Sequence, residues 1–278
     1  MKFTKMHGCG NDYVYVSTFD ETVTDPNDLA RRIADRHFGV GGDGLILIEP
    51  SDTADARMRM FNADGSEGDM CGNGIRCVAK YIYDHGIVPA DRCTAVIDTR
   101  AGQKYVSLET ANGRAVRITV DMGEPRLTSE LPEAITVADR ALTFVGVDVG
   151  SKHAVYYLDE NPALGAERVE DLPLDRLGPA FENHPRFPDR VNSEFIRLRS
   201  RTEIDFRVWE RGSGETLACG TGATAAVYAG IRLGRLDNTV LVHLIGGDLT
   251  IRFDPVSRHC FMTGPAVEVF TGDYTPDA

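Results

Sequence analysis

Two short stretches, Cys71-Gly72-Asn73-Gly74 and Cys219-Gly220-Thr221-Gly222, decide the fold of this chain. Apolar residues follow each of them at the i, i+3, i+4, i+7 and i+8 spacing of one buried helix face. They are Ile75, Val78, Ala79, Ile82 and Tyr83 after the first stretch, and Ala223, Ala226, Val227, Gly230 and Ile231 after the second. Each run then reaches a glycine, Gly86 or Gly234, which suits a left-handed C-cap. The sequence therefore predicts two helices that each begin at a Cys-Gly-x-Gly stretch.

The match between the two halves extends upstream in one register. Three further pairs keep the offset of 148 positions that separates the cysteines (219 − 71): Phe61 with Trp209, Glu67 with Glu215, and Arg59 with Arg207. Several matches in one register indicate an internal duplication. Because there are only two copies, a solenoid is excluded.

Short β-rich runs separated by turn residues recur along the chain, and several alternate apolar and polar residues as half-buried antiparallel strands do. Examples are residues 95–98, 116–120, 206–209 and 249–253. With the duplicated helices they predict an α+β fold of two similar α/β domains that face each other. We place the N-terminal domain, which carries Cys71, at residues 1–115 plus 265–278, the last part including a returning strand around Val267–Phe270. The C-terminal domain, which carries Cys219, then spans 116–264, and the active site lies in the cleft between the domains.

Two weaker helical patterns cover residues 29–37 and 174–181. The segment from Glu160 to Pro188 carries several prolines and many charges, so we expect it to run over the surface as loop and helix.

The composition excludes several classes of protein. The net charge of −12 argues against binding to nucleic acid or to an anionic membrane. The N-terminal residues lack the apolar run of a signal peptide, and no segment approaches membrane-spanning length, so we expect a cytoplasmic protein. The six cysteines are too sparse for a disulfide scaffold. No CxxC or matching His cluster suggests zinc, so we expect no metal site.

The chemistry of the two Cys-Gly-x-Gly stretches follows from their place at helix N-termini. The backbone N–H groups there carry partial positive charge and bind carboxylates. The same field is expected to lower the thiol pKa from about 8.5 towards neutrality. With the two copies facing each other, one thiolate removes the α-hydrogen of a bound amino acid and the other thiol returns a proton to the opposite face. This arrangement predicts inversion of the α-carbon without a cofactor.

The sequence closely resembles the diaminopimelate epimerase family over nearly its whole length. The resemblance lies in an ordered set of motifs: His7-Gly8-Cys9-Gly10-Asn11-Asp12, Phe61-Asn62-Ala63-Asp64-Gly65-Ser66-Glu67, Met70 to Cys77, Glu182-Asn183-His184-Pro185, Val191-Asn192-Ser193-Glu194-Phe195, Trp209-Glu210-Arg211-Gly212 and Glu215 to Gly222. It implies a pseudo-twofold pair of domains, each a largely antiparallel sheet wrapped around a central helix. It also implies a homodimer that interconverts LL- and meso-diaminopimelate, in lysine and peptidoglycan precursor synthesis, without a cofactor.

The resemblance also assigns residues by position. Cys71 and Cys219 match the catalytic pair, and His153 and Glu210 match residues thought to tune those cysteines. The residues that match substrate contacts are Asn11, Asn62, Gly72, Asn73, Asn192, Glu210, Arg211, Gly220 and Thr221. Arg211 suits bidentate capture of the distal carboxylate.

Two departures from the family pattern bear on substrate preference. Where the family usually reads Gly-Asn-Pro-His, this chain has Gly150-Ser151-Lys152-His153, so a substrate-contacting asparagine is replaced by a shorter serine. Gly44 follows Asp43 where many members have glutamine.

Structural interpretations stand beside the functional ones. We expect Cys9, Cys77, Cys93 and Cys260 to be small buried residues. His153 could be a structural histidine, Glu210 and Arg211 a solvated strand end, and Arg76 a brace for its loop. Glu67 and Glu215 could be helix-entry residues favoured by the helix dipole.

Three other functions remain open on the sequence. The nearest is racemisation of proline or hydroxyproline on the related fold, which needs no distal carboxylate or ammonium recognition. A thiol redox or sensing protein would also use two reactive cysteines. A binding protein for diamino acids would show affinity without proton exchange.

Overall fold

The computed structural model describes residues 1–275 and separates into two compact units. Unit 1 comprises Met1–Val120 and the chain from Thr263 onward, and unit 2 comprises Asp121–Met262. Both units combine a mainly antiparallel sheet with helices, so the predicted α+β class is confirmed. None of the helices in the described chain is long and apolar enough to cross a membrane.

Unit 1 contains two helices and most of the N-terminal strands. Its elements are β1 (Lys2–Gly8), β2 (Asn11–Ser17), α1 (Pro26–Ile33), β3 (Gly44–Glu49), β4 (Ala56–Asn62), β5 (Glu67–Gly68), α2 (Gly72–Asp84), β6 (Thr94–Thr99), β7 (Gly102–Ala111), β8 (Arg114–Gly123), β18 (Cys260–Gly264) and β19 (Val267–Asp273), of which β8 and β18 cross between the units.

Unit 2 contains the remaining elements and three short 3-10 turns between β12 and α3. They are β9 (Arg126–Leu127), β10 (Glu133–Val137), β11 (Arg140–Asp148), β12 (Lys152–Tyr157), α3 (Leu174–Glu182), β13 (Asn192–Ser200), β14 (Glu203–Glu210), β15 (Gly214–Glu215), α4 (Gly220–Arg232), β16 (Thr239–Leu244) and β17 (Gly247–Phe253).

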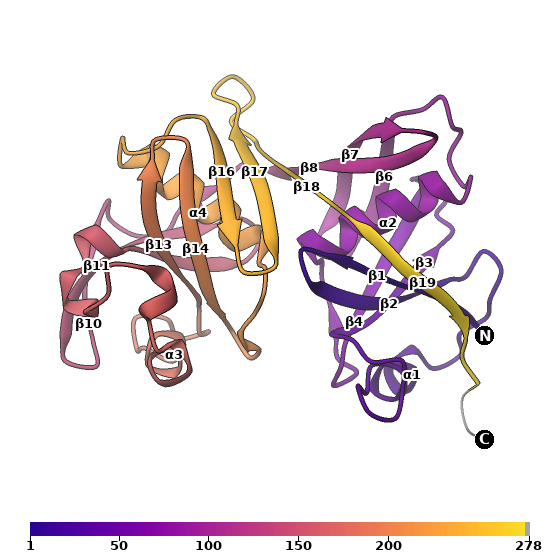
Figure 1. Ribbon diagram of the computed structural model, residues 1–278, viewed down its shortest axis with the longest axis horizontal. Helices are drawn as coiled ribbons and strands as arrows, with labels where there is room; N and C mark the ends of the chain where they lie inside the picture. The colour runs from indigo at the N-terminus through magenta and orange to yellow at the C-terminus, as the bar shows by residue number, and fades with distance from the viewer. Residues whose placement is uncertain (276–278) are drawn as a thin grey trace. The chain divides into compact units, whose positions relative to one another are not determined.

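The two units repeat one order of strand pairings. In unit 1 the pairs β1–β2, β2–β3, β3–β4, β4–β6 and β6–β7 are antiparallel, parallel, antiparallel, parallel and antiparallel. In unit 2 the pairs β11–β12, β12–β13, β13–β14, β14–β16 and β16–β17 follow the same order. Figure 1 shows one helix of each unit, α2 or α4, against its own sheet. The duplication seen in the sequence is therefore a duplication of topology.

The C-terminal strand belongs to the first unit. β19 pairs antiparallel with β1, Lys2 lying opposite Asp273 and His7 opposite Val267. Figure 1 shows this strand in yellow beside the indigo N-terminal strand. The sheet of the first unit therefore contains strands from both the N-terminal and the C-terminal part of the chain.

The two duplicated helices have equal length and similar ends. Each spans 13 residues, and each is preceded by a cysteine N-cap in extended conformation whose sulfur accepts a hydrogen bond from the N–H three residues later. After them Gly86 and Gly234 have φ of +71° and +73°, the left-handed conformation predicted for a C-cap glycine. α2 and α4 therefore begin one residue after Cys71 and Cys219.

The residues upstream of the two cysteines form a second duplicated feature, an ion pair between arginine and glutamate. Arg59 Nε lies 2.8 Å from Glu67 Oε1, and Arg207 Nε lies 2.6 Å from Glu215 Oε1. In both cases Nη2 bonds the second carboxylate oxygen, so each pair is bidentate. These ion pairs clamp the β4–β5 and β14–β15 turns that lead into the cysteines. Glu67 and Glu215 are thus ion-pair partners of arginine.

Two local expectations were wrong. The helix predicted for 29–37 begins at Pro26 and ends at Ile33, because Asp35 Oδ1 accepts the N–H groups of His37 and Phe38 in a turn instead. The segment from Glu160 to Pro188 is loop and helix as expected, but it does not lie only on the surface. It contributes Leu164, Val169, Leu172, Leu174, Leu177 and Phe181 to the core of unit 2.

Candidate active site

Cys71 is held just before α2 by a backbone N–H of that helix and by a side chain from β2. Its sulfur accepts the N–H of Gly74 at 3.3 Å, and its thiol donates to Asn11 Oδ1 at 3.2 Å. Asn11, at the start of β2, donates in turn through Nδ2 to Asp43 Oδ2 at 2.7 Å. The structure therefore brings together Cys71 and Asn11, two residues predicted for the site, and adds Asp43 as the anchor.

Charged side chains fix the position of this anchor. Arg36 Nη2 lies 2.9 Å from Asp43 Oδ1 and 2.8 Å from Asp12 Oδ1, and Lys5 Nζ contacts Asp12 from the other side. Burial acts to raise the pKa of Asp12, but hydrogen bonds and attraction from Arg36 and Lys5 outweigh it, so the pKa is lowered. Asp12 is thus an anion within this network at neutral pH.

The remaining predicted residues of unit 1 lie on α2 and at the end of β4. Gly72 and Asn73 form the first turn of α2, where Asn73 is buried, and Asn62 ends β4 with its Nδ2 donating to Ser66 Oγ at 3.0 Å. Arg76 is fully buried and donates to the backbone oxygens of Gly72 and Pro265, each at 3.1 Å. Arg76 therefore braces the first turn of α2.

Cys219 occupies the same position on α4 but has a different electrostatic environment. Its sulfur accepts the N–H of Gly222 at 3.4 Å and shares a hydrogen bond of 3.4 Å with Thr221 Oγ1. Burial raises the pKa of Cys219 well above its ordinary value, and the carboxylates of Glu210 and Glu194 raise it further. The expectation that the helix end would lower this pKa was wrong, because burial and two nearby carboxylates outweigh the stabilising groups.

A buried histidine–glutamate pair lies on the strands that face α4. His153 on β12 and Glu194 on β13 have fully buried side chains, and Nδ1 lies 2.7 Å from Oε1. His153 Nε2 forms a hydrogen bond of 2.8 Å with Ser151 Oγ. Burial raises the pKa of Glu194, while the neighbouring His153 acts to lower it. His153 is therefore held from both ring nitrogens.

The other predicted residues of unit 2 lie at the ends of β13 and β14. Glu210 accepts a short hydrogen bond from Thr216 Oγ1, and Asn192 Oδ1 accepts the backbone N–H of Arg211 at 2.8 Å. The Arg211 side chain is exposed, with Nη1 donating to the Asp189 carbonyl at 3.3 Å. Gly220 and Thr221 form the first turn of α4.

Ser151 and Lys152, which depart from the family pattern, each contact a residue of unit 2. The Lys152 side chain lies on the surface, with Nζ 2.7 Å from Asp189 Oδ2. Ser151 points to His153. Both substitutions therefore have defined partners in unit 2.

The other cysteines are mostly buried. Cys9, Cys77 and Cys260 are buried as expected, and burial raises the pKa of Cys77 to about 11 and that of Cys260 to about 12. Cys93 is exposed, so the expectation of burial was wrong there. It lies just before β6, outside the sheet core. Among the described residues, no group of three or more His, Cys, Asp or Glu side chains could hold a metal ion.

Two residues near the cysteines were missed by the sequence reasoning. Asp43 was noted only for the glycine that follows it, and Glu194 only as part of a motif. The one available signal for Glu194 was a charged residue immediately before the apolar pair Phe195-Ile196 in a strand.

Comparison with known proteins agrees with the motifs. Residues 3–128 and 145–269 match the family model described as diaminopimelate epimerase. The chain belongs to the diaminopimelate epimerase family. A diaminopimelate epimerase from Agathobacter rectalis is 50% identical, covering 98% of this chain and 99% of the relative. One from Methanococcus maripaludis is 46% identical, with 98% and 99% covered.

Solved structures show how widely the fold of this diaminopimelate epimerase family member is shared. A probable proline racemase from Agrobacterium radiobacter aligns with a TM-score of 0.76 at 16% identity, covering 99% of this chain and 93% of that one. A hydroxyproline epimerase from Agrobacterium vitis gives 0.71 at 16% identity, with 98% and 91% covered. At such low identity the likeness concerns the fold alone.

Proposed function

We propose that this chain interconverts LL- and meso-2,6-diaminopimelate without a cofactor, using Cys71 and Cys219 as its acid–base pair. One observation carries the proposal: each of the two duplicated helices of this diaminopimelate epimerase family member begins directly after a cysteine whose sulfur caps it. The reaction is an isomerisation in lysine and peptidoglycan precursor synthesis.

The chemistry uses both helix ends on one substrate. The first turn of a helix leaves backbone N–H groups without intrahelical partners, and these groups bind a carboxylate. Gly72 and Asn73 on α2, with Gly220 and Thr221 on α4, supply such groups in our proposal. They also stabilise the negative charge that develops on the carboxylate as the α-carbon loses its proton. Inversion requires the two sulfurs to reach this carbon from opposite faces.

Residues near each cysteine complete the proposed site. Asn11 holds the thiol of Cys71, whereas His153 and Glu210 set the charge around Cys219. Asn62 and Asn192 contact the substrate, and the exposed guanidinium of Arg211 binds the distal carboxylate in a bidentate manner.

Isotope exchange tests this proposal directly. The purified protein, free of pyridoxal phosphate, is incubated with LL-diaminopimelate in deuterated water. We expect deuterium at the α-carbon together with the meso isomer. Cys71→Ala and Cys219→Ala should each abolish inversion while the fold is retained, and Cys93→Ala, which removes an exposed thiol, should keep the native rate. Inversion at the native rate in either catalytic variant would rule out the two-thiol mechanism.

A racemase of proline or hydroxyproline is the alternative substrate assignment. The named relatives at 46% and 50% identity are diaminopimelate epimerases, whereas the proline-type structures share only 16% identity. The same isotope assay with L-proline and trans-4-hydroxy-L-proline should show no exchange. Exchange with these substrates and none with diaminopimelate would reverse the assignment.

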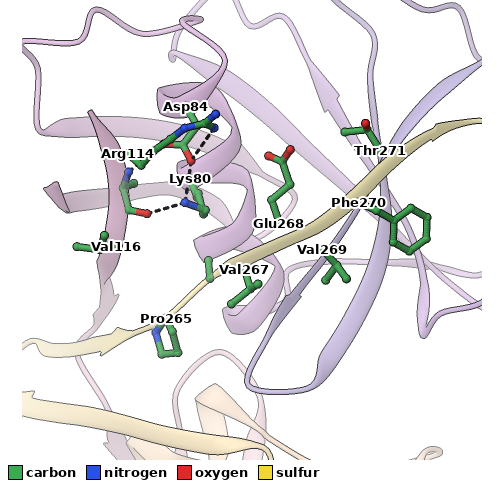
Figure 2. Close-up of a pocket in the computed structure, with 12 residues that line it drawn as sticks. Lys80, Asp84, Arg114, Val116, Pro265, Val267, Glu268, Val269, Phe270 and Thr271 are labelled. Atoms are coloured by element: carbon green, nitrogen blue, oxygen red, sulfur yellow. Dashed lines mark hydrogen bonds and ion pairs between the residues drawn. The ribbon is translucent and has the colours of Figure 1, made fainter. Parts of the chain in front are cut away.

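We also propose a homodimer, formed through an apolar strip on unit 1. Val116, Val267, Val269 and Phe270 are exposed and line a groove of about 640 Å³ beside α2. Figure 2 shows Val267, Val269 and Phe270 along β19 and Val116 on β8, with Asp84 paired with both Lys80 and Arg114 at one side. Contiguous exposed apolar side chains favour association with another protein surface. A second copy of this chain is the proposed occupant.

The dimer has a matched test. Val269→Lys places a charge in the apolar strip and should shift the protein to monomer in light-scattering chromatography. Val256→Lys changes another exposed valine, on the loop after β17, and should leave the mass unchanged. If Val269→Lys keeps the dimer mass, the interface lies elsewhere.

The proposed chemistry needs both cysteines reduced and free of disulfides, so we place the protein in the reducing cytoplasm. The six cysteines are free thiols in the structure. Cell fractionation tests the location: recovery of the protein outside the cytoplasmic fraction would contradict it.

A further inference from the structure

The duplicated topology allows residue-by-residue comparison of the two cysteine environments. α2 and α4 differ by 148 positions at both ends (220 − 72 and 232 − 84), as do Cys71 and Cys219. Gly74 and Gly222, whose N–H groups bond the two sulfurs, are counterparts by the same offset. Each helix packs these glycines against its own sheet.

The side chains under the two glycines are counterparts as well, but they differ in charge. A Cβ on Gly74 would meet Ile46 Cδ1 at 2.6 Å and Met58 Cε at 3.1 Å. A Cβ on Gly222 would meet Glu194 Oε1 at 2.8 Å and Phe206 Cζ at 3.1 Å. The offset is again 148 for both pairs (194 − 46 and 206 − 58). Glu194 therefore stands where the first half has isoleucine.

Neighbouring positions continue the asymmetry. Glu210, near Cys219, has Asn62 as its counterpart (210 − 62 = 148). His153 pairs with Asn192 in the parallel β12–β13 pair. The residue at the corresponding place in the β2–β3 pair is Tyr13, which comes one residue before the pairing of Val14 with Leu45. Unit 2 thus carries Glu194, His153 and Glu210 on three strands, where unit 1 has Ile46, Tyr13 and Asn62 at the matching positions.

The carboxylate is close enough to the sulfur to affect its ionisation. The Cβ position of Gly222 lies 2.8 Å from Glu194 Oε1 and 3.3 Å from Cys219 Sγ, so these two atoms are separated by at most the sum, 6.1 Å. A like charge within about 6 Å disfavours ionisation and raises the pKa of a thiol. Glu194 Oε2 is buried and has no hydrogen-bond partner within the described chain, and His153 is the side chain that bonds Oε1.

We propose that Glu194 is a positioning residue that keeps Cys219 protonated in the resting enzyme, so that Cys219 is the acid of the pair. The inference rests on the proposed two-thiol function and deepens it. Removing the proton from Cys219 places its charge beside Glu194 unless Glu194 takes up a proton, so the two groups titrate as a coupled pair. In the first half, Ile46 imposes no such penalty. Cys71, whose thiol donates to Asn11 Oδ1, is then the sulfur that loses its proton more readily and acts as the base.

A titration of the Cys219 thiol tests this role without any substrate. The ultraviolet absorbance of the thiolate is followed against pH for the native protein and for Glu194→Gln. The same measurement on each protein carrying Cys219→Ala is subtracted, which isolates this one sulfur. We expect the midpoint of Cys219 to fall by about one pH unit or more in Glu194→Gln.

Two further variants sharpen the result. Asp205→Asn removes another buried carboxylate from unit 2, bonded to Arg197 and Arg199, and should leave the midpoint unchanged. Glu194→Asp keeps the charge on a shorter side chain, so its midpoint should lie between those of the native protein and Glu194→Gln. If Glu194→Gln does not fold, the titration of Glu194→Asp decides the question.

If Glu194→Gln folds and the midpoint of Cys219 does not shift, the inference is overturned even if activity is lost. If Glu194→Gln is unfolded, an unshifted midpoint in Glu194→Asp overturns it. With substrate, the basic limb of the kcat/KM profile should move to lower pH by the same amount, which a merely structural role would not cause. Absence of deuterium exchange in the native enzyme would contradict the proposed function and would leave the titration result intact.

Discussion

The thiol of Cys71 donates a hydrogen bond to Asn11 Oδ1 over 3.2 Å, although 60 positions separate the two residues in the sequence. Asn11 is fixed in turn by Asp43, which accepts its Nδ2 at 2.7 Å and the backbone N–H of Asp12 at 3.1 Å. The orientation of the proposed catalytic thiol therefore depends on a carboxylate that does not itself touch the sulfur.

Asp43→Ala tests this dependence. Without its anchor, Asn11 is free to rotate away from Cys71, and a hydrogen bond to a charged group contributes about 1.5–3 kcal/mol. We expect kcat/KM for LL-diaminopimelate to fall by roughly tenfold or more, since each factor of ten corresponds to about 1.4 kcal/mol. Asp91→Ala, at an exposed position, is the control and should keep the native value. Equal rates for the two variants would show that Asn11 needs no anchor.

The bidentate pair of Arg59 and Glu67 predicts a pH-dependent contribution to stability. Hydrogen bonds from Arg59 lower the pKa of Glu67 below its ordinary value of 4.5. The unfolded chain then binds this proton at higher pH than the folded protein. The stabilisation is therefore complete above pH 4.5 and is lost as the pH falls through the folded pKa.

Glu67→Gln should remove this part of the pH dependence. At neutral pH we expect the free energy of unfolding, measured with urea, to fall by roughly 1 kcal/mol. The difference from the native protein should shrink in acid. Glu170→Gln alters an exposed pair with Arg168, and pairs of this kind contribute about 0–1 kcal/mol, so it should have little effect. A constant difference at all pH values would contradict the prediction.

Alanine at the two motif glycines should have unequal effects. In Gly74→Ala the new methyl meets Ile46 Cδ1 and Met58 Cε, the mobile ends of flexible side chains. In Gly222→Ala it meets Glu194 Oε1, which is held 2.7 Å from His153 Nδ1. Overpacking typically costs about 1–3 kcal/mol. We expect Gly222→Ala at the upper part of this range and Gly74→Ala at or below its lower end, by urea unfolding; the reverse order would show that Glu194 moves freely.

The thiols should differ sharply in reactivity at neutral pH. Cys93 is exposed, whereas the buried thiols of Cys77 and Cys260 have a pKa raised to about 11 and about 12. Because the thiolate is the reacting form, iodoacetamide should modify Cys93 well before either of them. Mass spectrometry of the peptides measures the order. Early modification of Cys77 in the folded protein would contradict its burial.

The sequence predicted the duplicated elements accurately because their causes are local. The apolar spacing after Cys71 and after Cys219 predicted two helices, and both begin at the following glycine. Gly86 and Gly234 predicted their C-caps for the same reason, since a left-handed residue favours glycine. The end of α1 was missed because Asp35 forms a turn with the residues after it, which the apolar pattern does not report.

Family membership and the candidate cysteines were also available from the sequence, because the motifs that carry them are contiguous. The electrostatics around Cys219 were not. The helix end favours the thiolate, but burial and two carboxylates prevail, and these come from strands β13 and β14. His153 and Glu194 are 41 positions apart and meet only because β12 and β13 pair in parallel. Local sequence thus decided where each thiol caps a helix, whereas tertiary packing decided which charges surround it, because electrostatic interaction depends on distance in space.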